Sequence, residues 1–175
     1  MSVSFKTLLV LRTDHGQQDT DQEVRNSTVK PRIHVVTLAV ADLDRALAFY
    51  RDGLGFPTDG LIGTEFSGDE TSPNGTTAVF HLDDGLMLSI YPRPELAKDA
   101  LVPLAAGGPG EFSIGHVVDS RAEVDQVIAQ ARAAGATVPD APHDRPWGIY
   151  SGYFQDPDGH LWEIIWNPAL DLASP

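Results

Sequence analysis

The sequence predicts an α+β fold in which two βαβββ modules place curved mixed sheets around a cavity. The first reason is an internal duplication: Gly85 aligns with Gly159 at an offset of 74 residues (159 − 85), and Asp42 aligns with Asp119 at an offset of 77 (119 − 42). The second reason is the order of patterns, because each half reads as one strand, one helix and three further strands. Such a unit leaves one sheet face without a helix, so two copies can curve around a common cavity.

The first module is predicted to span residues 32–92, after an N-terminal extension of residues 1–31. The polar part of the extension has no periodicity, so we expect a flexible segment; the alternative is a strand and linker that reach a neighbouring subunit. Within the module, Asp42 is expected to cap a helix that ends at Gly53 and Gly55. Its strands are expected at residues 32–40, 61–66, 76–82 and 86–91.

The second module is predicted to span residues 112–168, with residues 93–111 as a linker and residues 169–175 as a tail. The linker is predicted from its Pro, Ala and Gly clusters. Inside the module we expect, in order, a strand at residues 112–118, a helix at residues 121–134 closed by Gly135, a weak strand near Thr137, a loop through residues 140–147 and a final hairpin.

The final hairpin, residues 152–168, contains the strongest local signal in the chain. Its turn has Asp156 first, Pro157 second and Gly159 fourth, which a type I turn prefers. In the strand that follows, alternation puts Glu163 on one face with two aliphatic residues and puts the tryptophans on the other. The first face comprises Leu161, Glu163 and Ile165, and the second comprises Trp162, Ile164 and Trp166. We interpret the tryptophans as core beneath the second helix.

Composition and charge exclude several classes of function. The chain has 175 residues, a formal net charge of −13 and no cysteine. The negative charge argues against nucleic-acid partners, since binding to phosphates requires clustered Lys and Arg. No apolar run is long enough for a signal peptide or a membrane span, and the lack of cysteine fits the cytosol. We therefore expect a cytoplasmic protein with no nucleic-acid or membrane partner.

The chain resembles the vicinal oxygen chelate superfamily, which includes glyoxalase I, extradiol dioxygenases and the bleomycin-resistance proteins. The segments that carry the resemblance are Val36–Tyr50 (VTLAVADLDRALAFY), Leu54–Phe56 and Tyr153–Glu163 (YFQDPDGHLWE). The resemblance covers residues 32–168 and implies paired βαβββ modules, with a ligand cavity inside each module or shared between modules. Because family members frequently dimerise and exposed sheet edges permit pairing, a homodimer is expected.

The resemblance also implies where a metal would bind. Enzymes of the superfamily usually hold a divalent ion with one His from the first strand and one Glu from the last strand of each module. In this chain, those positions are occupied by Val35 and Ser89 in the first module, and by Ser113 (or Phe112, if the register differs by one) and Glu163 in the second. One carboxylate and one hydroxyl do not supply the donors that a divalent ion needs. No metal or other cofactor is predicted; the alternative is one divalent ion.

Four of the chain's six histidines are considered as further donors, and none of the four repairs this donor set. His34 and His116 are out of phase with the cavity face, His81 is expected in the outer strand of a hairpin, and His160 in a turn. Because position decides whether a histidine acts as a ligand, all four are interpreted as surface or core-edge residues.

Glu163 is the candidate catalytic residue. A lone carboxylate among aliphatic side chains is expected to be desolvated, which suits a general acid or base near neutral pH and would permit enolisation of a carbonyl substrate. The alternative is that Glu163 only hydrogen-bonds Thr37, Ser89, Ser113 or a backbone amide inside the cavity.

The predicted ligand-binding residues combine cavity-face side chains with an aromatic loop. Trp147 and Tyr150 lie beside glycines and are typical of a pocket wall for a planar ligand, although core packing is an alternative. Arg145 is expected to anchor a carboxylate or phosphate, or to be a solvated loop residue. The predicted set is Thr37, Ser89, Tyr91, Ser113, Arg145, Trp147 and Tyr150.

Three functions follow from these patterns. The chain is predicted to bind a small organic molecule without metal, as bleomycin-resistance-like proteins do when they sequester or sense a ligand. The alternative is an enzyme, a lyase, isomerase or dioxygenase of the superfamily type, with Glu163 as general base or as sole surviving metal ligand. A structural role as an interaction domain is expected if the protein's own side chains fill the cavity.

Overall fold

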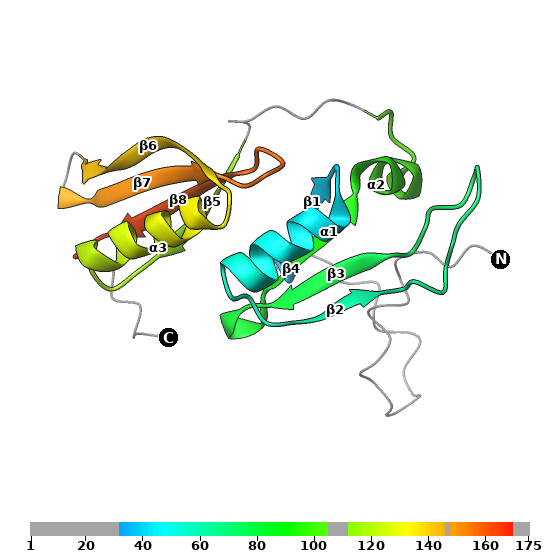
Figure 1. Cartoon of the computed structure of the whole chain (residues 1–175), viewed down its shortest axis with the longest axis horizontal. Coiled ribbons are helices and arrows are strands. Elements are labelled where there is room, and N and C mark those ends of the chain that lie inside the picture. Colours follow the sequence, from blue (N-terminus) through cyan, green and yellow to red (C-terminus); the bar gives the residue numbers. More distant parts are fainter. Residues whose placement is uncertain (1–31, 105–111, 146–147, 170–175) are drawn as a thin grey trace, which may run out of the picture.

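The computed structural model describes residues 32–104, 112–145 and 148–169, which form two four-stranded mixed sheets with α-helices packed against them (Figure 1). The elements are β1 (Val35–Val40), α1 (Leu43–Leu47), the π-helical turn η2 (Ala48–Gly53), β2 (Thr58–Ile62), β3 (Thr77–His81), the 3-10 turn η3 (Asp83–Gly85), β4 (Met87–Pro92), α2 (Arg93–Ala100), β5 (Ser113–Val117), α3 (Arg121–Ala133), β6 (Thr137–Asp144), β7 (Tyr150–Gln155) and β8 (Leu161–Trp166). This architecture confirms the predicted α+β class.

The two sheets have the same topology. The strand order is β1-β4-β3-β2 in the first sheet and β5-β8-β7-β6 in the second. In each sheet, the first and last strands of the module pair in parallel, and the other neighbours pair antiparallel. Helix α1 packs on the first sheet and α3 on the second (Figure 1), so each sheet has one face covered by its helix and one face that we call its open face.

The helix that follows the first strand of each module begins with a side-chain cap. The Asp42 Oδ1 accepts a hydrogen bond from the Arg45 amide at 2.9 Å, and the Ser120 Oγ accepts one from the Glu123 amide at 3.2 Å. These bonds satisfy amides that a helix N-terminus leaves without an intrahelical partner. The predicted cap at Asp42 is confirmed, and α3 ends within one residue of its predicted boundary.

Strand β2 lies earlier than predicted, at residues 58–62 instead of 61–66. Gly63 has a φ of 71° and ends the strand, and Phe66 lies in a turn with 46% of its surface exposed. Asp59 and Gly60 together lie opposite the single residue Val79, because Thr58 pairs with Phe80 and Leu61 with Ala78. Two residues opposite one define a β-bulge, which alternation of apolar residues does not reveal.

Two proline-containing segments predicted as connections are regular structure. The segment expected as a linker begins with α2, where Pro94 in the first turn costs no hydrogen bond. Strand β6 continues to Asp144, although residues 140–147 were expected to be a loop. Pro139 and Pro142 are tolerated there because β6 is an edge strand with two register shifts.

A single hydrophobic core joins the two modules, and aromatic side chains of both meet in it. Tyr50, from η2, is fully buried, and its hydroxyl donates to Asp156 Oδ2 at 2.7 Å and accepts from Trp162 Nε1 at 3.3 Å. The Trp162 ring stacks on Phe154 with an interplanar angle of 6°. The face of β8 predicted to be core is therefore confirmed at Trp162, and it packs against the first module as well as its own helix.

The turn before β8 also binds the first module. The Asp158 side chain is only 2% exposed. Its Oδ1 accepts hydrogen bonds from the Ala41 amide at 2.7 Å and from Arg45 Nη2 at 2.9 Å. The predicted type I turn is supported by the bond from the Gly159 amide to the Asp156 carbonyl, at 3.0 Å. This turn therefore holds the last hairpin and the start of α1 in a fixed relation.

Candidate functional site

The open face of the second sheet carries Glu163. Its neighbours in β8, Trp162 and Ile164, are buried on the other face, whereas Glu163 is half-buried. Gly115 pairs with Glu163 across the parallel strands, and a Cβ added there would meet only Ile165 Cδ1, at 3.5 Å. The predicted separation of Glu163 from the tryptophans is confirmed, and the glycine leaves space next to the carboxylate.

A hydrogen-bonded set of side chains surrounds this carboxylate. Ser151 Oγ donates to Glu163 Oε1 at 3.0 Å and accepts from Arg145 Nε at 3.0 Å. The Arg145 guanidinium also pairs with Asp140 and lies 5.5 Å from the centre of the Tyr153 ring. We call these five residues, which lie on or beside β6, β7 and β8, the Glu163 group. Their bonds fix the direction of the carboxylate before any ligand binds.

Electrostatics in the Glu163 group favour a protonated phenol beside an acceptor. Burial is the main cause that raises the pKa of Tyr153 above 10.0, and its hydrogen bond with Glu163 raises it further. The Tyr153 hydroxyl is therefore a hydrogen-bond donor throughout the neutral range. The group thus offers a carboxylate acceptor, a phenol donor and a guanidinium within one patch of sheet.

Three of the predicted ligand-binding residues lie on the open face of the first sheet. Thr37 pairs with Ser89 in the parallel register, and the buried Ser89 Oγ lies 3.1 Å from Thr77 Oγ1. Tyr91 is also buried, and its hydroxyl donates to the Asn74 carbonyl. Burial, with Asp99 and Glu95 nearby, raises the pKa of Tyr91 to about 12. These residues form a polar patch that is separate from the Glu163 group.

The remaining predicted residues do not join Glu163, with one exception. Ser113 is exposed on edge strand β5 and pairs with Leu161, not with Glu163. Tyr150 lies on the helix-covered face, where its hydroxyl donates to Asp125 Oδ1 at 2.9 Å, so it is not part of the Glu163 group. Trp147 lies outside the described residues. Arg145 is the predicted residue that the structure brings to Glu163, through Ser151.

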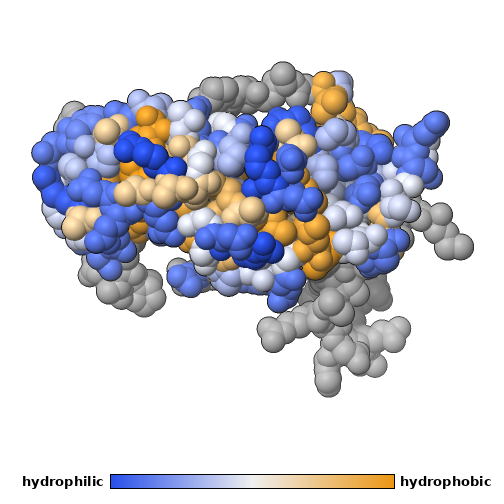
Figure 2. Space-filling view, viewed as in Figure 1, coloured by the Kyte–Doolittle hydropathy of each residue, from blue (hydrophilic) through white to orange (hydrophobic). Residues whose placement is uncertain are grey.

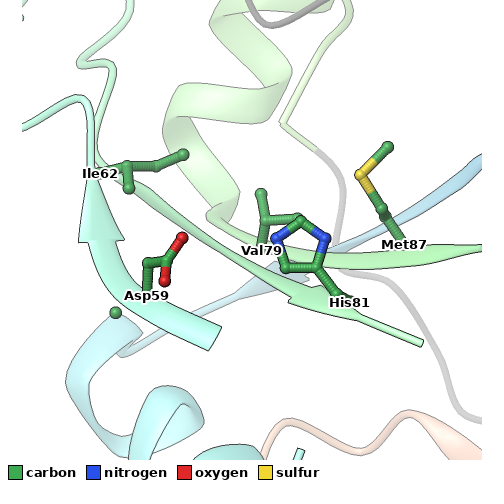
Figure 3. Close-up of a pocket in the computed structure, with 6 residues that line it drawn as sticks. Asp59, Ile62, Val79, His81 and Met87 are labelled. Atoms are coloured by element: carbon green, nitrogen blue, oxygen red, sulfur yellow. The ribbon is translucent and has the colours of Figure 1, made fainter. Parts of the chain in front are cut away.

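A hollow that the sequence does not predict lies on the open face of the first sheet. Its volume is about 180 Å³, and Figure 3 shows its side chains arising from three adjacent strands. The lining residues are Asp59, Gly60, Ile62, Val79, His81 and Met87. A glycine inside a strand pattern is a sequence signal for a bulge. The strand predicted at residues 61–66 begins after Gly60, so the signal at Gly60 lies outside it. His81, interpreted from sequence as a surface or core-edge residue, lines this hollow.

The donor set does not fit a divalent metal. Among the residues that the structure describes, no three His, Asp or Glu side chains lie close enough together to hold an ion. The backbone register places Val35 opposite Met87, Ser113 opposite Leu161 and Gly115 opposite Glu163. A divalent ion at Glu163 would therefore find a carboxylate that is already bound by Ser151, and the residues paired with Glu163 on the neighbouring strands, Gly115 and Tyr153, supply no imidazole.

Comparison with known proteins establishes the family. Residues 32–164 match the family described as the Glyoxalase/Bleomycin resistance protein/Dioxygenase superfamily. The chain belongs to this superfamily. Its two modules, in each of which the first and last strands pair in parallel, agree with this membership.

Similar proteins share this fold at modest identity. A glyoxalase-related enzyme from Fulvimarina pelagi is 27% identical with a TM-score of 0.66, over 79% of this chain and 90% of that one. A lactoylglutathione lyase from Agrobacterium tumefaciens is also 27% identical with a TM-score of 0.58, over 79% and 95% of the two chains. The protein YraH of Bacillus subtilis, described as uncharacterized, is 27% identical over 131 residues, which are 74% of this chain and 93% of that protein.

The structure contains no candidate for a membrane-spanning helix in its described parts. None of those helices combines sufficient length with sufficient apolar character to cross a bilayer.

Proposed function

We propose that this protein binds a small organic molecule at the Glu163 group and does so without a metal ion. The proposal rests on two consecutive hydrogen bonds, from Arg145 to Ser151 and from Ser151 to Glu163. They orient a half-buried carboxylate on the open face of the sheet. Polar groups whose orientation is fixed before binding lower the cost of ordering them when a ligand binds.

The arrangement also suggests what the ligand must offer. Glu163 is an acceptor, and the Tyr153 hydroxyl is a donor held beside it. Arg145 is paired with Asp140, so its charge is already balanced, and an anionic ligand would have to displace that carboxylate. A neutral polar molecule with both a donor and an acceptor fits these groups better than the carboxylate or phosphate expected from Arg145 alone.

Catalysis by Glu163 is the second candidate, and the position of Tyr153 favours it. Glu163 would take a proton from the carbon next to a carbonyl group, the C–H electron pair would form a C=C bond, and the carbonyl π pair would move to the oxygen. The Tyr153 hydroxyl, which donates to Glu163 while that side chain is a carboxylate, would then donate to the enolate oxygen instead. Sequence alone offered no such donor. The names of the Fulvimarina and Agrobacterium proteins, an enzyme and a lyase, are consistent with chemistry on this fold.

Native mass spectrometry combined with thermal melting tests the binding proposal. We expect the purified protein to retain or accept an organic ligand, and we expect Ni²⁺, Zn²⁺, Mn²⁺ and Fe²⁺ to leave its melting temperature unchanged, since only a species that binds the folded state stabilises it. A large melting shift with any of these ions, or a stoichiometric metal in the native spectrum, contradicts the metal-free proposal.

Glu163→Gln separates binding from catalysis, because it keeps the shape of the side chain and removes its charge. Glu65→Gln, in an exposed loop, is the matched control. If Glu163 is a general base, turnover is lost by roughly a hundredfold or more while the ligand still binds. Equal turnover in both variants would exclude the catalytic role, and unchanged ligand affinity in Glu163→Gln would exclude the binding role.

A homodimer in the cytoplasm remains our proposal for the assembled protein. On the face seen in Figure 2, hydrophilic residues predominate, with apolar residues gathered along the middle of the molecule. Several large apolar side chains are at least one-third exposed, namely Ile33, Leu61, Phe66, Leu101, Val102, Leu104 and Phe112. Exposed apolar side chains and open edge strands support self-association. Sedimentation that gives a monomer across a wide concentration range would contradict the dimer.

A further inference from the structure

We propose that the hollow on the first sheet is a second binding site, one that takes the ammonium or amidinium group of a small organic cation. It shares no residue with the Glu163 group, and none of its residues belongs to the predicted ligand set. Its test is therefore independent of the proposed function at Glu163.

The β-bulge in β2 builds this site. Asp59 and Gly60 occupy the place opposite Val79 where a regular strand would put one residue. The Thr58 hydroxyl stabilises the bulge, because it donates to the Val79 carbonyl at 2.6 Å and accepts from the Gly60 amide at 3.1 Å. Gly60 has a φ of 86°, a backbone conformation that residues with a side chain rarely adopt. A Cβ at this position would meet nothing within 4 Å. Bulges redirect side chains and are frequent beside binding sites.

The side chains around the hollow combine a carboxylate with an apolar floor. Val79 is buried, and Ile62 and Met87 are half-buried, whereas Asp59 and His81 are exposed at the edge of the hollow. Figure 3 shows Asp59 and His81 arising from adjacent strands, with Val79 on the same strand as His81. Within the described residues, neither the Asp59 carboxylate nor the His81 imidazole has a hydrogen-bonding or ionic partner, although the His81 backbone amide donates to the Pro57 carbonyl.

These features define the chemistry of the ligand. A carboxylate without a partner forms its strongest hydrogen bonds with a charged N–H donor, and an imidazole nitrogen can accept a second one. The alkyl part of a cation would lie on Val79, Ile62 and the Met87 thioether. At about 180 Å³, the hollow is smaller than the roughly 300–1,000 Å³ of drug-sized pockets, so it suits a compact group. The chain's net charge of −13 further favours a cationic ligand over an anionic one.

Titration of the full-length protein with n-butylammonium chloride, followed by nuclear magnetic resonance, tests this site. Met87 lines the hollow, so methionine labelled at its methyl carbon gives a reporter inside it. We expect a saturable shift of the Met87 methyl signal with millimolar affinity. The neutral analogue 1-butanol, which has the same alkyl chain, is expected to bind at least about tenfold more weakly, since it cannot form the charged bond with Asp59.

Matched substitutions identify the group responsible. Asp59→Asn is expected to weaken butylammonium binding by about tenfold or more, whereas Asp83→Asn, which removes an equal charge from an exposed residue outside the hollow, is expected to change it less than about twofold. An amide correlation spectrum of each variant verifies that it is folded, and Asp59→Ala provides a second variant at the same position. The proposal is wrong if butanol binds as well as butylammonium, if Asp59→Asn binds like the unmodified protein, if Asp83→Asn loses as much affinity, or if no saturable shift occurs.

Discussion

Replacing Tyr50 by phenylalanine removes one hydroxyl from the buried contact between the modules and keeps the ring. That hydroxyl donates to Asp156 Oδ2 at 2.7 Å and accepts from Trp162 Nε1 at 3.3 Å. Hydrogen bonds to a charged group contribute about 1.5–3 kcal/mol, and the Asp156 carboxylate keeps its bonds from the His160 ring and from two backbone amides. We therefore expect the free energy of unfolding to fall by about 2 kcal/mol, which corresponds to roughly 4–8 °C in melting temperature for a chain of this size.

The effect of Tyr50→Phe has a defined pH dependence. Although burial opposes it, the hydrogen bonds from His160 and Tyr50 hold the pKa of Asp156 below its ordinary value of 3.8. A carboxylate with a lowered pKa stabilises the fold above its unfolded-state pKa, and this contribution is lost as the pH falls through the folded-state pKa. Without the Tyr50 bond, the pKa of Asp156 rises, so less stability remains to be lost in acid. The difference between the two proteins should be largest near neutral pH and should shrink below about pH 4.

Urea unfolding monitored by tryptophan fluorescence measures this prediction, because Trp162 lies at the contact. Tyr150→Phe is the matched control: it removes a hydroxyl whose partner, Asp125, is exposed, and it is expected to cost about 0.5 kcal/mol or less. Equal losses in the two variants, or a Tyr50→Phe deficit that stays constant as the pH falls, would refute the assignment of Asp156 and Tyr50 as an anchor between the modules.

Three further outcomes follow from single contacts. Asp42→Ala is expected to lower the free energy of unfolding by about 1 kcal/mol in urea titrations, since the Arg45 amide loses its cap, whereas Asp42→Asn should retain most of it. Gly152→Ala is expected to lower it by about 1–3 kcal/mol, because its Cβ would lie 2.8 Å from the Pro142 nitrogen; a neutral effect in calorimetry would contradict this packing. The Tyr153 phenol is expected to ionise above pH 10.0, which an ultraviolet titration of the protein minus that of Tyr153→Phe measures; ionisation below that value would contradict its contact with Glu163.

The periodic parts of the fold were predictable from sequence, and its irregular parts were not. Helix α3 and the last hairpin have strong local signals, a capping serine, a closing glycine and an Asp-Pro-Asp-Gly turn, and both lie where expected. Strand β2 does not lie where expected, because its bulge breaks the alternation of apolar and polar residues on which the prediction depends. Strand β6 was read as a loop because its prolines are poor strand formers unless the strand lies at an edge, which only tertiary structure reveals.

The candidate site could be predicted only in part, for a related reason. Alternation along β8 was sufficient to place Glu163 opposite the tryptophans, because one strand fixes its own two faces. The partners of Glu163 depend on the register between strands: Ser151 and Tyr153 are on β7, and Arg145 reaches Ser151 from the end of β6. Tyr150 is predicted to line the pocket, but it precedes Ser151 by one residue on β7 and pairs with Trp166. Its side chain therefore lies on the opposite, helix-covered face.

The residues that carry the family resemblance stabilise the architecture more directly than they support chemistry. Asp156 and Asp158, from the Asp-Pro-Asp-Gly turn, have buried side chains that bind Tyr50, Ala41 and Arg45 of the first module. Such contacts would be kept whatever the protein binds, because removing one partner leaves a buried carboxylate unsatisfied.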